Sequence, residues 1–301
     1  MALSPPPPRP TADQPPLAPA LGGDSFGIDG INVYVDGQGP PLLLVHSVNA
    51  AASAAEVRPL YEHHRSTRTV YALELPGYGR SRRDDIAYSP RLMTDALHAV
   101  AAQIRLRHGP APLDAMALSL SCEFLVRAAV EQPAHWGRLV LVSPTGFMGL
   151  RPRRGPPGST RGFAWLHRIL SQPLWSQALF NALTRPDVVR YFLARTWGSK
   201  AIDETLCAYS VLSAKQPGAR FAPLHFLAGN LFSNDITTLY EALTQPVWAS
   251  HGIRGDFTDY RGMAIVRDRP NWQIDVYPTG ALAYFEVPAE FGARCDQFLA
   301  T

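Results

Sequence analysis

The stretch DAMALSLSCEF, residues 114–124, decides the fold. Its first half is apolar like a buried strand, its second half begins a helix, and Ser119 lies at the junction. A nucleophile on such a sharp turn has a strained backbone and needs small residues two positions before and after it. Ala117 and Ser121 meet this requirement for Ser119, whereas Ser121 itself would have the large Glu123 two positions after it. The spacing therefore predicts Ser119 as a nucleophile at the end of a strand.

Strand-like runs alternate with helix-like runs on both sides of this turn. The run at residues 42–45 is apolar throughout, as expected for a strand covered on both faces. Apolar residues recur every four positions within residues 91–107, which indicates a helix. The expected strands are residues 31–35, 42–45, 69–75, 113–118, 139–142, 247–249 and 273–277. Buried strands separated by helices predict an α/β fold with a mostly parallel central sheet flanked by helices.

Two segments depart from this alternation. Prolines crowd the first 20 residues, so we expect residues 1–22 to form a disordered tail that favours polyproline II. Residues 147–242 carry many large aromatic side chains but no convincing buried strand, which predicts an inserted helical cap, or lid. Most of these aromatics are expected to dock the insert, and others to face an apolar pocket. The core is then residues 23–146 and 243–301.

Composition excludes several classes of protein. The chain has 301 residues, 46% hydrophobic and 18% charged, which is too apolar for a disordered protein. It has no apolar run long enough to span a membrane, and its net charge of +3 is too weak to suggest nucleic-acid binding. Three cysteines, an odd number without zinc-type spacing, predict reduced thiols. Residues 1–10 lack a signal-peptide core, so we expect a cytoplasmic protein. We also expect no membrane insertion, cofactor or metal. The expected partner is a small apolar substrate or ligand.

Three further stretches, with the turn at Ser119, resemble the α/β-hydrolase superfamily. PLLLVHSVN at residues 41–49 is similar to the strand and oxyanion loop, and LPGYGRS at residues 75–81 to the D-x-P-G-x-G-x-S turn. RLVLVSP at residues 138–144 resembles the strand that precedes the cap. The resemblance covers residues 23–300 and is weakest in the cap. The superfamily's nucleophile turn has the pattern Gly-x-Ser-x-Gly, and here alanine and serine replace the two glycines. It implies the α/β-hydrolase fold, with the cap inserted after the sixth strand.

The resemblance also implies a triad in the chain order nucleophile, acid, histidine. The acid belongs after the strand that follows the cap, where Asp256 is our first choice and Asp259 the reserve. A turn aspartate that caps backbone amides is the alternative reading of Asp256. The position of the histidine is occupied by Tyr284, and no histidine occurs after His251.

Tyr284 is a poor general base. The pKa of tyrosine is about 10, against about 6.5 for imidazole, so only about one tyrosine in a thousand is ionised at pH 7, a deficit of about 4 kcal/mol. A nearby Asp256 would disfavour the tyrosinate further. A neutral Tyr284 would instead donate a hydrogen bond to Asp256 or to a substrate oxygen.

Other histidines are candidates for the base. His251 ends the strand before the acid, His46 lies in the oxyanion loop and His225 in the cap. His46 and His251 are also ordinary at these positions in the superfamily, where they serve structure. We expect His63, His64 and His108 on the surface at helix ends.

Two backbone N–H groups, of Leu120 and Val48, are the expected oxyanion donors. Ser47 stands where the superfamily has glycine, so a positive φ there would strain the loop. Asn49 is a further side-chain donor, and Cys122 is expected to pack in the core.

Three functions remain open. The first is a serine hydrolase, similar to esterases and thioesterases, that acts on a small or medium apolar carbonyl compound through Ser119 and Asp256. The second is a non-hydrolytic enzyme, such as a lyase, isomerase or cofactor-free oxygenase, that uses the Ser119 and Tyr284 hydroxyls as hydrogen-bond donors. The third is a degenerate enzyme that binds an apolar ligand without transforming it.

Overall fold

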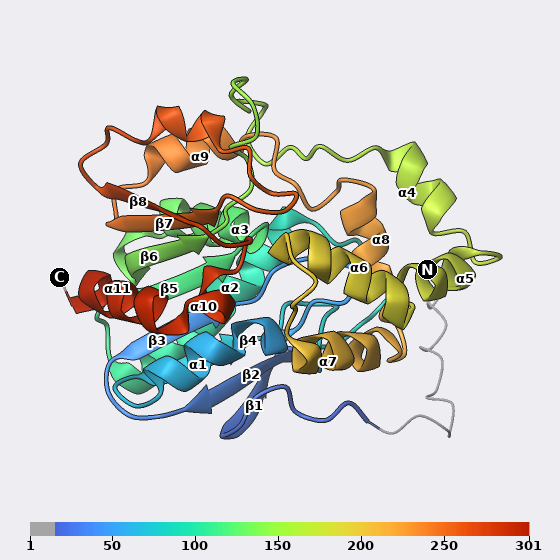
Figure 1. Cartoon of the computed structure of the whole chain (residues 1–301), viewed down its shortest axis with the longest axis horizontal. Coiled ribbons are helices and arrows are strands. Elements are labelled where there is room, and N and C mark those ends of the chain that lie inside the picture. Colours follow the sequence, from blue (N-terminus) through green and yellow to red (C-terminus); the bar gives the residue numbers. More distant parts are fainter. Residues whose placement is uncertain (1–15, 301) are drawn as a thin grey trace, which may run out of the picture.

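The computed structural model describes residues 16–300. An eight-stranded sheet forms the centre, with the spatial order β1-β2-β4-β3-β5-β6-β7-β8 (Figure 1). The pairs β1–β2 and β2–β4 are antiparallel, and every pair from β4–β3 onward is parallel. The strands are β1 (Asp24–Ile28), β2 (Ile31–Asp36), β3 (Pro41–Val45), β4 (Thr69–Leu73), β5 (Leu113–Leu118), β6 (Trp136–Val142), β7 (Val247–Gly252) and β8 (Trp272–Tyr277). The seven expected strands are present, and the predicted α/β fold class is confirmed.

The edge strand β1 is the one that sequence patterning missed. Its five residues, DSFGI, are mostly exposed, so they lack the apolar run that marks a buried strand. It is held by antiparallel pairing with β2, and backbone hydrogen bonds of this kind leave no side-chain signature.

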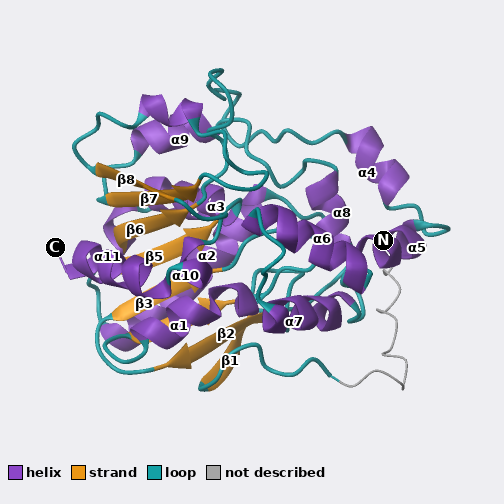
Figure 2. Ribbon diagram, viewed as in Figure 1, coloured by secondary structure: helices purple, strands orange, loops and turns teal. Residues whose placement is uncertain are grey.

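Helices cover both faces of the sheet (Figure 2). Successive strand residues point to opposite faces, so Leu43 and Val45 join one core cluster while Leu42 and Leu44 join the other. The first cluster is covered by α2 (Pro90–His108), α3 (Ser121–Glu131) and α9 (Ile236–Ala242), and the second by α1 (Arg58–His64), α10 (Ala283–Glu286) and α11 (Pro288–Ala300). The predicted helix at residues 91–107 is α2, which begins where the Ser89 side chain accepts a hydrogen bond from the Leu92 N–H.

The chain between β6 and β7 contains only helices as regular elements, and most of them lie to one side of the sheet (Figure 1). They are α4 (Ala164–Leu170), α5 (Ser176–Leu183), α6 (Pro186–Trp197), α7 (Glu204–Ala214) and α8 (Phe221–Leu227). The last helix of this segment, α9, instead packs against α3 of the core. From here on, the word cap means only the part from α4 to α8, which is shorter than the predicted cap at residues 147–242.

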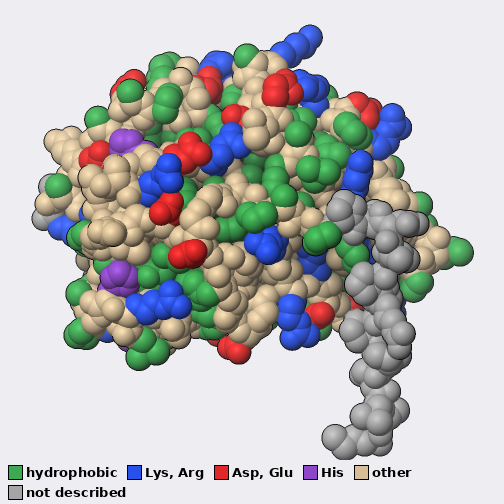
Figure 3. Space-filling model, turned by 90° about the horizontal axis from the view of Figure 1, so that it is seen from below, with side chains coloured by type: hydrophobic (Ala, Val, Ile, Leu, Met, Phe, Trp, Pro, Cys, Tyr) green, Lys and Arg blue, Asp and Glu red, His purple; other side chains and the backbone are tan. Residues whose placement is uncertain are grey.

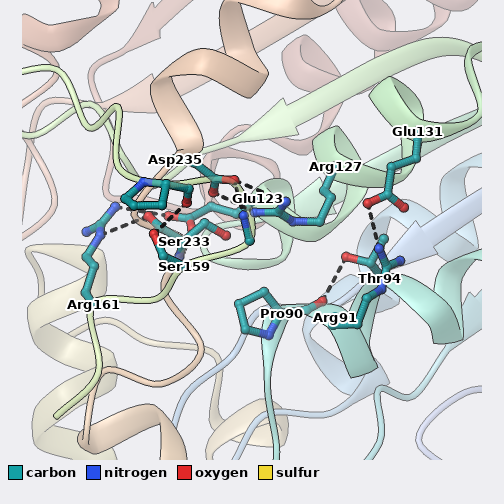
Figure 4. Close-up of polar contacts among 12 residues, drawn as sticks. Pro90, Arg91, Thr94, Glu123, Arg127, Glu131, Ser159, Arg161, Ser233 and Asp235 are labelled. Atoms are coloured by element: carbon teal, nitrogen blue, oxygen red, sulfur yellow. Dashed lines mark hydrogen bonds and ion pairs between the residues drawn. The ribbon is translucent and has the colours of Figure 1, made fainter.

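A buried polar network joins the segment between β6 and β7 to α3 (Figure 4). Arg127 of α3 forms an ion pair with Asp235 at 2.7 Å, and Asp235 also accepts the Gly158 N–H at 2.7 Å. The carboxyl group of Glu123 accepts hydrogen bonds from the Thr145 hydroxyl at 2.6 Å and the Ser233 N–H at 2.7 Å. Because the charged groups of Glu123, Arg127 and Asp235 are buried and bonded in this way, the network fixes how the segment leaves and rejoins the core.

The expected tail lies partly outside the described residues, which begin at residue 16. Within residues 16–22, Leu21 is buried, the Ala18 carbonyl accepts the Tyr209 hydroxyl at 2.7 Å, and the Ala20 N–H donates to the Tyr34 hydroxyl at 3.1 Å. This part of the predicted tail is therefore bound to the body of the protein.

On the face seen from below, acidic and basic side chains are interspersed with apolar ones (Figure 3). None of the helices among residues 16–300 is long and apolar enough to cross a membrane.

Candidate active site

Ser119 occupies a strained turn between β5 and α3. Its φ is +52°, in the left-handed region that non-glycine residues rarely adopt. Its N–H donates to the Val142 carbonyl of β6 at 2.8 Å, and its carbonyl accepts the Cys122 N–H at 3.1 Å. Within residues 16–300 the Ser119 hydroxyl makes no hydrogen bond, and the residue is partly exposed. The turn thus presents a free hydroxyl at the carboxyl edge of the sheet.

The neighbouring serine has a different role. The Ser121 hydroxyl is buried and donates to the His46 carbonyl at 2.5 Å. This hydrogen bond ties the start of α3 to the loop after β3, so the hydroxyl of Ser121 is engaged where that of Ser119 is not.

The two backbone amides that the sequence suggests as oxyanion donors are both unpaired within residues 16–300. Neither the Leu120 nor the Val48 N–H has an acceptor in the part of the chain that the structure describes. Leu120 is the N-cap of α3, so the positive end of that helix dipole adds to the field at this point. Ser47 does not have a positive φ, so serine in place of glycine causes no backbone strain there.

A buried carboxyl group, which sequence reasoning missed, holds the oxyanion loop. Glu56 accepts the Ser47 N–H at 2.8 Å with one oxygen and the Asn49 side-chain amide at 2.7 Å with the other. Burial raises the pKa of Glu56, and the hydrogen bonds from Ser47 and Asn49 oppose that rise. The only signal in the sequence is the pattern S-x-x-E at residues 53–56, which predicts a helix start rather than a site residue.

Tyr284 is hydrogen-bonded to the backbone of the same residue, Glu56. Its ring is fully buried in α10, and its hydroxyl donates to the Glu56 carbonyl at 2.7 Å. Burial raises the pKa of Tyr284 well above its ordinary value, and the Glu56 carboxylate raises it further. The phenol is therefore protonated at neutral pH, and its proton is directed to a backbone oxygen.

The two candidate acids lie in surface ion pairs. Asp256 is exposed in the loop after β7, where Arg195 of α6 contacts both carboxylate oxygens, one of them at 2.7 Å. The Arg195 hydrogen bonds hold the pKa of Asp256 below its usual value. Asp259 pairs with Arg261 at 2.8 Å and accepts the Gly149 N–H at 3.1 Å. Within the described residues, every side-chain hydrogen bond of Asp256 goes to Arg195, which links the cap to the core.

The candidate histidines are all uncharged at neutral pH, but they differ in their free nitrogens. His46 uses both ring nitrogens, with Nδ1 2.6 Å from the Ser47 carbonyl and Nε2 accepting the Leu75 N–H at 3.0 Å, and burial lowers its pKa to about 4. His225 of α8 has Nδ1 3.0 Å from the Asn230 amide, and burial lowers its pKa to about 4.

His251, at the end of β7, is the third of these candidates. It stacks on Tyr260 with ring centroids 3.9 Å apart, and its Nδ1 lies 3.1 Å from the Gly252 carbonyl. Its Nε2 has no partner among residues 16–300, and burial lowers its pKa. Of the three, His251 alone keeps a ring nitrogen available to accept a proton.

The space between cap and core near this loop is narrow. A cavity of about 10 Å³ is lined by Ala50, Tyr78 and neighbouring residues of the core and by Ser213 of α7. The Tyr78 hydroxyl is buried and has no hydrogen-bond partner in the described residues. A cavity of this size, lined by polar groups of Tyr78, Arg83 and Ser213, has room for a single water molecule.

Comparison with known proteins identifies the fold. No protein-family model matches the sequence, and no curated protein matches it. Among solved structures, a serine hydrolase involved in carbazole degradation is similar, with 15% identity, a TM-score of 0.70, and coverage of 92% of this chain and 98% of that one.

A meta-cleavage product hydrolase from Pseudomonas fluorescens IP01 shows 14% identity and a TM-score of 0.70 over 92% and 97% of the two chains. A carboxylesterase from Bacillus subtilis shows 17% identity and a TM-score of 0.67 over 92% of each chain. The sheet order, the turn at Ser119 and these similarities together establish that the chain has the α/β-hydrolase fold.

Proposed function

We propose that the protein is a hydrolase that attacks small or medium apolar ester or thioester carbonyls with Ser119. The observation that carries this proposal is the free, partly exposed Ser119 hydroxyl on a left-handed turn beside two unpaired amides. Strained backbone is concentrated at functional sites, and at Ser119 it is combined with a hydroxyl that no hydrogen bond to the described residues holds.

In the proposed reaction, Ser119 Oγ bonds to the carbonyl carbon and loses its proton. The carbonyl oxygen becomes an oxyanion that accepts hydrogen bonds from the Leu120 and Val48 amides. Collapse of this tetrahedral intermediate expels the alkoxide or thiolate, which takes up a proton and leaves an acyl-serine. Water then hydrolyses the acyl-serine and releases the carboxylic acid. Since no described imidazole contacts Ser119, the proton passes to water, and we expect turnover about 10²–10⁴ times slower than with a positioned base.

Covalent labelling tests the nucleophile. We expect a fluorophosphonate probe to label the full-length protein slowly at one site, and Ser119→Ala to abolish labelling. Ser143→Ala is the matched control, because Ser143 also ends a central strand with a positive φ of 49°, but its hydroxyl donates to the Ala281 carbonyl at 2.6 Å. Equal labelling of the wild type and Ser119→Ala would remove Ser119 from the mechanism.

The pH dependence of labelling tests where the proton goes. If the proton is lost to solvent before attack, so that the Ser119 alkoxide is the reacting form, the rate constant is expected to rise about tenfold per pH unit between pH 7 and pH 9. If His251 accepted it, the rate would already be constant in this range, because burial lowers the pKa of His251 and leaves the ring in its neutral, basic form. A plateau that disappears in His251→Gln would contradict the water pathway and assign the base.

A degenerate, ligand-binding protein is the second candidate. The observation that favours it is that Tyr284 and Asp256, the positions of histidine and acid, are both engaged elsewhere, with Glu56 and Arg195. Saturable binding of apolar esters without turnover and without labelling would support this candidate over the hydrolase.

A further inference from the structure

The last turn of α1 and the C-terminal helix α11 meet in a cluster of metal-binding side chains. His63 and His64 end α1, and Asp296 lies on the facing turn of α11. His63 Nε2 is 2.9 Å from one oxygen of Asp296, and His64 Nδ1 is 3.3 Å from the other. One ligand atom from each of the three residues lies within 4.8 Å of the other two.

His64 is the unusual member of the cluster. We expected it on the surface, but this is wrong, since its side chain is fully buried beneath α11. Neither ring nitrogen makes a hydrogen bond with the described residues, although Nδ1 lies 3.3 Å from a carboxylate oxygen of Asp296. A buried polar group without a partner requires an explanation, and a bound ion is one.

Gly292 makes room for the second imidazole. A Cβ at this position would lie 2.6 Å from His63 Cε1 and 2.9 Å from both ring nitrogens. Gly292 precedes Asp296 by four residues, so both lie on the same face of α11. The His63 ring therefore packs against the helix backbone with Nε2 beside the carboxylate.

We propose that His63, His64 and Asp296 bind a divalent transition-metal ion such as Zn²⁺. Two imidazoles and a carboxylate are typical zinc ligands, and imidazole nitrogens disfavour Mg²⁺ and Ca²⁺. Two ligands bound to zinc at about 2.1 Å in tetrahedral geometry lie about 3.4 Å apart. The two imidazole nitrogens lie 2.9 and 3.3 Å from different oxygens of Asp296, which places all three side chains within reach of one ion. The exposed fractions of the His63 and Asp296 side chains, 37% and 52%, leave the fourth position to water.

The site is distant from Ser119. His64 precedes β4, so it lies at the amino edge of the parallel strands, whereas Ser119 follows β5 at the carboxyl edge. The ion would cross-link α1 to α11 and stabilise the C-terminal helix without taking part in the reaction.

Calorimetric titration of the untagged, full-length protein with Zn²⁺ tests the site. We expect one Zn²⁺ per chain and a rise in the temperature of thermal unfolding when Zn²⁺ is added. Asp296→Asn and His63→Gln change half-exposed side chains and are each expected to weaken binding at least tenfold, because each removes a direct ligand. Gly292→Ala should weaken binding as well, since the added methyl group displaces the His63 ring.

His98→Gln is the matched control. His98 Nε2 is 2.9 Å from Glu131 on another surface, without a third ligand, so this variant should bind Zn²⁺ as the wild type does. Absence of stoichiometric binding, or equal binding by wild type, Asp296→Asn and His63→Gln, would overturn the proposal.

Discussion

Replacing Asp235 with alanine is expected to lower the free energy of unfolding by about 3–5 kcal/mol. Asp235 and Arg127 are both buried, with exposed fractions of 4% and 7%, and the pair is joined at 2.7 and 3.3 Å. Removal of the carboxylate leaves the Arg127 guanidinium charged in the interior and the Gly158 N–H without its acceptor (Figure 4). Urea unfolding at equilibrium measures the change.

Two controls separate burial from charge. Asp187→Ala breaks an exposed pair with Arg185, where both side chains are 66% exposed, and should cost at most about 1 kcal/mol. The double variant Arg127→Met with Asp235→Leu replaces the buried pair with apolar side chains and should recover much of the lost stability. Equal losses for Asp235→Ala and Asp187→Ala would show that the network does not anchor the segment.

Glu56→Ala is expected to slow covalent labelling of Ser119 by about 10²–10³-fold. The Glu56 carboxyl group holds the Ser47 N–H and the Asn49 side chain, which flank Val48. Without these hydrogen bonds the Val48 amide loses its fixed position, which is equivalent to the loss of one oxyanion donor. The second-order rate constant for fluorophosphonate labelling measures this effect.

Two milder variants show whether the carboxyl group or the surrounding packing matters. Glu56→Gln keeps the shape but presents an NH₂ to one of the two donors, so an intermediate rate is expected. Tyr284→Phe removes only the hydrogen bond to the Glu56 carbonyl and should change the labelling rate by less than about tenfold. An unchanged rate in Glu56→Ala would mean that the loop does not depend on Glu56. Complete loss of activity in Tyr284→Phe would instead favour a reaction that uses the phenol.

The sequence predicted those features that depend on a few neighbouring residues. Mostly apolar runs of three to seven residues located the buried strands, because a strand covered on both faces has few polar positions. The same patterning missed β1, whose mostly exposed residues pair with β2 and place Phe26 and Ile28 against the core. It also misplaced His64, because a helix end shows its burial only when the helix packed over it, α11, is known.

At the candidate site, too, the local turn could be predicted from the sequence, whereas the long-range contacts could not. The turn at Ser119 follows from the small residues on either side of it, since the steric limits on that turn act within two positions. The partners of Tyr284 and Asp256 were decided by tertiary packing. Tyr284 bonds to a residue 228 positions away, and Asp256 to one 61 positions away. Hydrogen bonds and ion pairs over such separations depend on how helices and loops pack around the sheet, which no local pattern encodes.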